Sequence, residues 1–279
     1  MKVRVLSENT PYPGLGCEHG LSFHIEYNGK KYLLDTGASG LFAENAEKMG
    51  VDLADVDAAF LSHAHYDHSG GFAEFFRQNR TAKVYLQRAA KEKLCYKIIG
   101  PQRKYIGIPE GLLDDCRDRF VYVDGYREIG EGIHILPHTT EGLAKRAEHA
   151  HMYAVSSYGT EPDDFSHEQT VIFCEKDGLV CFNSCSHAGV ENIIKEVKEA
   201  FPGREILAFF GGFHMKGAEG NDSCSFPQQE VRDVASFLTE TCVAQFYSGH
   251  CTGTTGFAWL KEVMQDRLTA LHPGMEAEI

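Results

Sequence analysis

The feature that most constrains the fold is a dense set of metal-ligand side chains directly after a short apolar run. Residues 62–71 read Ser-His-Ala-His-Tyr-Asp-His-Ser-Gly-Gly, and the apolar residues 58–61 before them predict a buried strand. Neutral imidazole and carboxylate groups are the usual nitrogen and oxygen ligands of zinc and similar divalent ions. Such clustering is improbable by chance in a chain with 14 histidines among 279 residues. The segment therefore predicts a metal-binding loop at the end of a strand.

The spacing of these ligands indicates two ions. Alternate residues of a strand point the same way, so His63 and His65 can bind one ion together. Asp67 and His68 lie past the turn and can face a second ion, and ions about 3.5–4 Å apart are a recurrent device of hydrolases. The alternatives are a structural zinc site or a metal-free histidine cluster. A structural site would normally use cysteine ligands, and no Cys-x-x-Cys occurs in the sequence. A catalytic metal site is favoured.

The motif resembles the His-x-His-x-Asp-His signature of the metallo-β-lactamase-fold hydrolase superfamily. Upstream, residues 32–37 are similar to the strand-ending Asp-Thr-Gly of that superfamily, which implies that Asp35 supports the metal loop from behind. Cys-Ser-His-Ala-Gly at 185–189, Gly-Gly-Phe-His at 211–214 and Gly-His-Cys-Thr-Gly at 249–253 most resemble a subgroup called dihydropterin-aminobenzene-phosphate synthase-like. The resemblance implies an α/β (α+β) protein, a four-layer αββα sandwich formed by one domain over residues 1–279.

The hydrophobic pattern agrees with two sheet-rich halves that are each flanked by helices. Asn28-Gly29 predicts a tight hairpin between two of the strands. The predicted strands are 2–6, 21–27, 31–35, 58–62, 120–123, 133–136, 170–174, 179–182, 205–210 and 243–247. The predicted helices are 41–49, 72–78, 87–99, 191–200, 227–239 and 257–267. The less regular part, about 87–164, is expected to be a specificity insert that forms a substrate lid. Its His138, His149 and His151 are assigned to that lid or to the surface rather than to a metal.

The remaining ligands are expected from distant parts of the chain. His187 and His250 follow predicted strands, where the active sites of open sheets gather, and both match ligand positions of the family. The resemblance implies His63, His65 and His187 for one ion. It implies Asp67, His68 and His250 for the other.

The chain departs from the family at the residue that bridges the two ions. Most binuclear members carry a Gly-Asp there, whereas this sequence has Asn-Ser-Cys-Ser-His at 183–187. Either Cys185 takes the place of that Asp, or Glu168 or His167 supplies the missing ligand. A thiolate ligand would make the site softer and more easily oxidised. The alternative is that Cys185 is an inert buried thiol. His214 is a candidate hydrogen-bond donor or general acid, because imidazole titrates near neutral pH, or it has a structural role.

Charge and composition bound the partners and the compartment. A net charge of −13 argues against nucleic acid as the ligand. Residues 77–104 nevertheless carry nine cations and one anion. This basic island either steers a small anionic substrate or is a solvated helix face. No apolar run is long enough to cross a membrane. The nine scattered cysteines and the immediate start of a strand predict a cytoplasmic protein without a signal peptide.

The expected function is hydrolysis of a small anionic or phosphorylated metabolite by metal-activated hydroxide at a binuclear site. Asp67 would hold the second ion and orient the nucleophile. The ions are expected to be zinc, with manganese or iron as alternatives. Two other classes remain open: an iron-dependent redox or persulfide-handling enzyme, and a metal-retaining sensor or binding module without turnover. The sequence does not indicate the oligomeric state.

Overall fold

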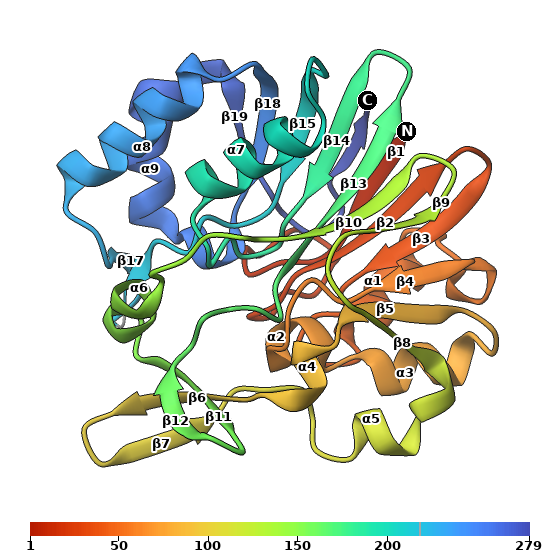
Figure 1. The fold of residues 1–279 in the computed structure, drawn as a ribbon. Helices are drawn as coiled ribbons and strands as arrows, with labels where there is room; N and C mark the ends of the chain where they lie inside the picture. Colours follow the sequence, from red (N-terminus) through yellow and green to blue (C-terminus); the bar gives the residue numbers. More distant parts are fainter. Residues whose placement is uncertain (218) are drawn as a thin grey trace.

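The computed structural model describes residues 1–217 and 219–279 as two facing sheets with helices on both outer sides (Figure 1). The first sheet has the strand order β20 (Glu276–Glu278), β1 (Lys2–Ser7), β2 (Ser22–Tyr27), β3 (Lys30–Leu34), β4 (Ala58–Phe60), β5 (Lys83–Gln87) and β8 (Phe120–Val123). The second has the order β19 (Leu268–Ala270), β18 (Val243–Ser248), β15 (Ile206–Phe210), β14 (Gly178–Phe182), β13 (Gln169–Glu175), β10 (Ile133–Pro137) and β9 (Arg127–Gly130).

Apolar side chains cover both faces of the first sheet, which explains why it lies inside the molecule. Successive residues of a strand point to opposite faces. Tyr32 of β3 therefore packs between the sheets, with its ring centroid 5.6 Å from that of Phe173, while Leu33 belongs to the outer core beneath the helices. In that outer core it is joined by Phe42 of α1 (Leu41–Lys48) and Phe72 of α3 (Phe72–Gln78). Both faces of the sheet are buried, and the expected αββα sandwich is confirmed.

The second sheet is covered by three longer helices, α7 (Val190–Ala200), α8 (Gln228–Glu240) and α9 (Thr254–Met264), seen in the green-blue and blue part of Figure 1. Each contributes buried apolar side chains such as Ile193, Val231 and Leu260. The short helical turns are η1 (Leu53–Asp55), α2 (Tyr66–Ser69), α4 (Ala89–Glu92), α5 (Leu112–Asp115), η2 (Arg117–Arg119), α6 (Ala144–His149), η3 (His250–Thr252) and η4 (Gln265–Arg267). Within the described ranges, no helix has the length and apolar character of a membrane-spanning segment.

The prediction of a helix over residues 87–99 is wrong. Only α4 is helical there, and β6 (Leu94–Ile99) pairs with β7 (Gln102–Tyr105) across a turn at Gly100 and with β11 (Met152–Ser156) far along the chain. Strand pairing with distant partners overrides the helical preference of the local Ala, Lys and Glu residues. With β12 (Gly159–Pro162) these strands form a separate four-stranded sheet, the accessory sheet, at the lower left of Figure 1.

The segment predicted as an insert, 87–164, contains more than the accessory sheet. Its strands β8, β9 and β10 complete edges of the two main sheets. The two-stranded sheet of β16 (Lys216–Gly217) and β17 (Gly220–Cys224) lies outside this segment.

Gly70 lets the metal loop approach the backbone that follows β3. Its N–H donates to the carbonyl oxygen of Gly37, and a Cβ at position 70 would lie 2.1 Å from the carbonyl oxygen of Ala38. We expect Gly70→Ala to lower the free energy of unfolding by roughly 1–3 kcal/mol, because the close-packed backbone has to shift. Urea denaturation would measure the loss. Gly130→Ala is the control, since a Cβ there meets nothing within 4 Å. Equal denaturation midpoints for the two variants would contradict the close approach.

Candidate metal centre

The predicted metal loop lies at the end of β4 and is buried. His63 is 1% exposed, His65 4%, Asp67 8% and His68 0%. The helical turn α2 follows His65 directly and redirects the chain at Asp67 and His68. The loop therefore presents its candidate ligands in two directions.

The first group of candidate ligands consists of His63, His65 and His187. Their ring centroids lie 4.6 Å (His63–His65), 4.9 Å (His63–His187) and 4.9 Å (His65–His187) apart. The Nε2 atom of each is buried and has no hydrogen-bond partner. Buried nitrogens without a partner are costly, and a bound cation would satisfy all three. Burial and neighbouring imidazoles lower the pKa of His65 to about 3 and hold the pKa values of the other two well below 6.5. All three are neutral, which is the form that binds metal.

The second group brings Asp67 together with His68 and His250. Asp67 Oδ2 lies 3.8 Å from His68 Nε2 and 3.4 Å from His250 Nε2, and the two Nε2 atoms are 3.2 Å apart. Each ring donates its Nδ1 proton to an oxygen: His68 to Asp35 Oδ2 at 2.7 Å and His250 to Asn9 Oδ1 at 2.9 Å. Two Nε2 atoms and a carboxylate therefore face one point, an arrangement that a bound cation would stabilise.

Asp67 is ionised in this setting. Burial alone would raise its pKa, but the adjacent imidazoles of His68, His19 and His250 hold the pKa well below 3.8. His19 Nε2 lies 3.2 Å from Asp67 Oδ2, and the His19 ring stacks on His250 with centroids 4.8 Å apart. The sequence reasoning did not select His19. The sequence indicated only that His19 lies in a turn-rich loop between two predicted strands, a place where functional residues are common.

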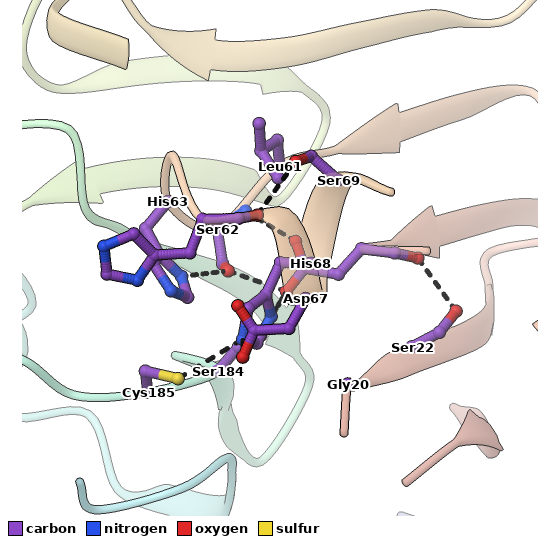
Figure 2. A network of polar contacts seen from close by, with 12 residues as sticks. Gly20, Ser22, Leu61, Ser62, His63, Asp67, His68, Ser69, Ser184 and Cys185 are labelled. Atoms are coloured by element: carbon purple, nitrogen blue, oxygen red, sulfur yellow. Dashed lines mark hydrogen bonds and ion pairs between the residues drawn. The ribbon is translucent and has the colours of Figure 1, made fainter. Parts of the chain in front are cut away.

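Asp35 organises the loop from behind, as the resemblance implied. Its Oδ1 accepts from the Ser62 N–H, and its Oδ2 accepts from the hydroxyls of Ser62 and Ser184 at 2.7 and 2.6 Å, besides His68. Because the Ser62 proton goes to Asp35, the Ser62 oxygen accepts from His63 Nδ1 at 2.8 Å (Figure 2). Asp35 thus fixes the tautomers that leave Nε2 of His63 and of His68 free for metal.

Cys185 lies between the two ligand groups. Its sulfur is 3.3 Å from His68 Nε2, and Figure 2 shows the thiol pointing at that ring. The possible ligand atoms of Cys185, His63 and His187 all lie within 4.8 Å of one another, and so do those of Cys185, His68 and His250. Burial and the neighbouring Cys251 raise the pKa of the Cys185 thiol well above 9, so an ion would have to displace its proton.

Glu168 and His167, the other candidates for the missing ligand, form hydrogen bonds within the protein. Both oxygens of Glu168 accept backbone N–H groups, from His187 at 2.7 Å and from Ala188 at 3.1 Å. His167 Nδ1 accepts from the Ala64 N–H, so its proton is on Nε2, where it meets Asp163 Oδ2 at 3.1 Å. Glu168 therefore holds the His187 loop, and His167 holds the metal loop.

His214 lies beside the first ligand group. Its ring centroid is 4.2 Å from that of His187, and its Nδ1 is buried without a hydrogen-bond partner. Its possible ligand atom lies within 4.8 Å of those of Cys185 and Cys251. Cys251, which is buried, is a second thiol at the centre that the sequence analysis did not select.

Both ligand groups open onto one cavity of about 690 Å³ between the two main sheets' loop ends and the accessory sheet. His149 and His151 line it, in agreement with their assignment to a lid, whereas His138 Nε2 bonds to the Phe165 carbonyl oxygen. Members of the two candidate groups that line the cavity are His65, Asp67, His187 and His250, and Cys185 and His214 line it beside them.

Comparisons with known proteins agree with this architecture. The family model described as the metallo-beta-lactamase superfamily matches residues 15–145. The crystal structure of Tm1679, a metal-dependent hydrolase of the β-lactamase superfamily, superposes with a TM-score of 0.83 at 25% identity, over 100% of this chain and 99% of that one. The chain is a metallo-β-lactamase-fold protein. This superfamily consists mostly of metal-dependent hydrolases, and its fold implies divalent metal binding.

Two further proteins are similar to this metallo-β-lactamase-fold protein. The 7,8-dihydropterin-6-methyl-4-(β-D-ribofuranosyl)-aminobenzene-5′-phosphate synthase of Methanocaldococcus jannaschii is 24% identical over 98% of this chain and 95% of its own length. A diphosphatase of the PhnP family shares the fold at 16% identity, with a TM-score of 0.55 over 100% of this chain and 97% of that one. These matches agree with the resemblance found in the sequence.

Proposed function

We propose that this protein is a metal-dependent hydrolase of a small anionic or phosphorylated metabolite, with two divalent ions. The observation that carries the proposal is a pair of buried groups, one with three Nε2 atoms left without a partner among the described residues and one with two Nε2 atoms facing Asp67, both of which open onto one cavity. His63, His65 and His187 would hold the first ion. Asp67, His68 and His250 would hold the second. Both sheets contribute ligands, which supports residues 1–279 acting as one domain.

The site chemistry follows from the donor set. Divalent ions bound there supply Lewis acidity and make a coordinated water more acidic, and zinc suits imidazole best, with manganese or iron as alternatives. Asp67 lines the cavity in ionised form and can hold and orient the attacking water. His214 has an unpartnered Nδ1 at the same cavity and can donate a hydrogen bond or a proton to the leaving group.

Cys185 is proposed as the replacement for the usual bridging carboxylate. Its position between both ligand groups supports this role, and the family's Asp is absent from the segment. A sulfur ligand is softer than a carboxylate and would favour zinc or iron over manganese.

Metal content tests the binuclear site. We expect about two ions per chain, by elemental mass spectrometry, in protein purified without oxygen or added metal. Cys185→Ala should lose most of one ion, since both groups share the thiol, whereas Cys185→Asp should retain two. The exposed Cys17→Ala is the control. One ion in the parent protein, or unchanged content in Cys185→Ala, would contradict a bridging thiol. Predominant iron would instead favour the redox or persulfide-handling alternative.

Partners and location complete the proposal. The acidic net charge and the size of the cavity, about 690 Å³, support a small-molecule substrate rather than nucleic acid. The nine cysteines are all free thiols, which supports a reducing compartment and hence the cytoplasm.

A further inference from the structure

Three lysines share the wall of the cavity that faces the metal ligands. Lys97 lies on β6, Lys104 on β7 and Lys216 on β16. The register pairs Lys97 directly with Lys104 across β6 and β7, and with Met152 on its other side. Directly opposed residues of antiparallel strands lie on the same face of a sheet. Lys97, Lys104 and Met152 therefore share the face of the accessory sheet that lines the cavity.

Among the described residues, no carboxylate lies within ion-pair distance of these lysines. Like charges directly opposed across two strands are destabilising. Elsewhere in the basic island, Arg88 pairs with Asp124 at 2.7 Å and Lys93 with Asp164 at 2.5 Å. In the part of the chain that the structure describes, the ion pairs include none of the three cavity lysines.

The lysines also act on one another. Burial lowers the pKa of Lys97, and the charges of Lys216 and Lys104 lower it further. Glu148 and Glu219 line the same cavity without forming an ion pair with them. This arrangement places three cations, Lys97 and Lys216 half-buried and Lys104 exposed, on one wall of the cavity, where a multiply charged anion would relieve their repulsion.

The lysines lie within reach of the proposed metal ligands. Lys216 Nζ is 3.3 Å from His19 Nδ1, and the opposite nitrogen of that ring is 3.2 Å from Asp67 Oδ2. Lys104 Nζ lies 5.4 Å from the centroid of the Tyr66 ring, in the metal loop itself. One imidazole ring thus separates an anion at Lys216 from Asp67. A single small molecule can occupy both places.

We propose that Lys97, Lys104 and Lys216 form a subsite for a phosphate group of the substrate that is not the group attacked at the metal centre. The inference rests on the proposed function, which supplies the reacting end. Each ammonium group has three N–H donors, and a phosphate dianion offers enough oxygens and charge to engage three of them. Binding energy from such a remote group would orient the reacting bond.

This proposal gives a role to only two residues of the basic island. Of its nine cations, only Lys97 and Lys104 line the cavity, and Lys216 joins them from a distant segment.

Isothermal titration calorimetry with glycerol 3-phosphate, and with glycerol as the uncharged partner, tests the subsite in the full-length metal-containing protein. We expect glycerol 3-phosphate to bind and glycerol not to bind. Lys97→Gln, Lys104→Gln and Lys216→Gln should each weaken binding about tenfold, equivalent to about 1.4 kcal/mol. Lys97→Arg should retain affinity within about threefold, because the charge remains. Lys176→Gln, at an exposed hairpin turn, is the matched control and should change nothing.

The outcomes separate the subsite from the proposed function. Affinity that is unchanged in all three lysine variants, or equally reduced in Lys176→Gln, would overturn the subsite. Binding that is lost on metal removal but unchanged by the lysine substitutions would show that the phosphate binds the metals. This result would also overturn the subsite. Lysine-dependent binding in a protein without hydrolytic activity would support the subsite and count against the proposed function alone.

Discussion

Asp67→Ala is expected to reduce kcat/KM for a chromogenic phosphoester by roughly 10³-fold or more, because the variant loses the one carboxylate of the second ligand group. Asp67 Oδ2 lies 3.2 Å from His19, 3.4 Å from His250 and 3.8 Å from His68, and these three neighbours are imidazoles, which do not carry the negative charge of a carboxylate. Steady-state kinetics and metal analysis on the same preparation would show whether activity and the second ion are lost together.

The control for this variant is Asp114→Ala, which removes an exposed carboxylate from α5 and should leave both readouts unchanged. Activity retained in Asp67→Ala would contradict its assignment. A parent protein that binds two ions yet hydrolyses none of a broad set of phosphoesters and lactones would favour the sensor or binding-module alternative.

Asp35→Asn is expected to weaken metal affinity by roughly 10–100-fold, the usual effect of losing a residue that orients metal ligands. The carboxylate accepts four hydrogen bonds, two from Ser62 and one each from His68 and Ser184. The asparagine amide has one oxygen where the carboxylate has two, so its NH₂ group would face the hydrogen-bond donors of Ser62, His68 or Ser184. We also expect the free energy of unfolding to fall by roughly 3 kcal/mol, because buried donors lose their acceptor.

Chelator competition and urea denaturation would measure the two effects of Asp35→Asn. Asparagine tolerates the left-handed backbone at this position, where φ is +58°, so the substitution isolates the lost charge from backbone strain. Asp124→Asn serves as the control, because its carboxylate is exposed and bonds only to Arg88 at the surface. Parent-like metal affinity in Asp35→Asn would show that Asp35 does not orient the histidines.

The sequence predicted the metal loop because its ligands are local. His63, His65, Asp67 and His68 occupy six consecutive positions, and the alternation of a strand followed by a turn suffices to divide them into two groups. His187 and His250 were predicted as candidate ligands because active sites tend to gather at strand ends. The facing sheets were predictable for the same reason, since their strands carry strong apolar patterns.

The parts that depend on distant pairing were not predictable. Residues 94–99 have a mixed composition that fits a helix, and their strand structure comes from pairing with β11, more than 50 positions later. His19 and Lys216 sit in irregular or very short elements whose approach to the cavity only the tertiary fold determines. The sequence shows the chemical type of such residues, but it does not show which side chains lie next to them in the fold.

The contacts between the accessory sheet and the metal loop set a limit on protein engineering. Ile106, just after β7, accepts from the Tyr66 N–H at 2.9 Å, and the Cys95 thiol of β6 lies 3.5 Å from His167 Nε2. A grafted sheet from a relative would have to reproduce both attachments to leave the ligand loop undisturbed. Exchanges confined to the outer hairpin tips of β6–β7 and β11–β12 should therefore be the most successful way to build chimaeras with altered selectivity.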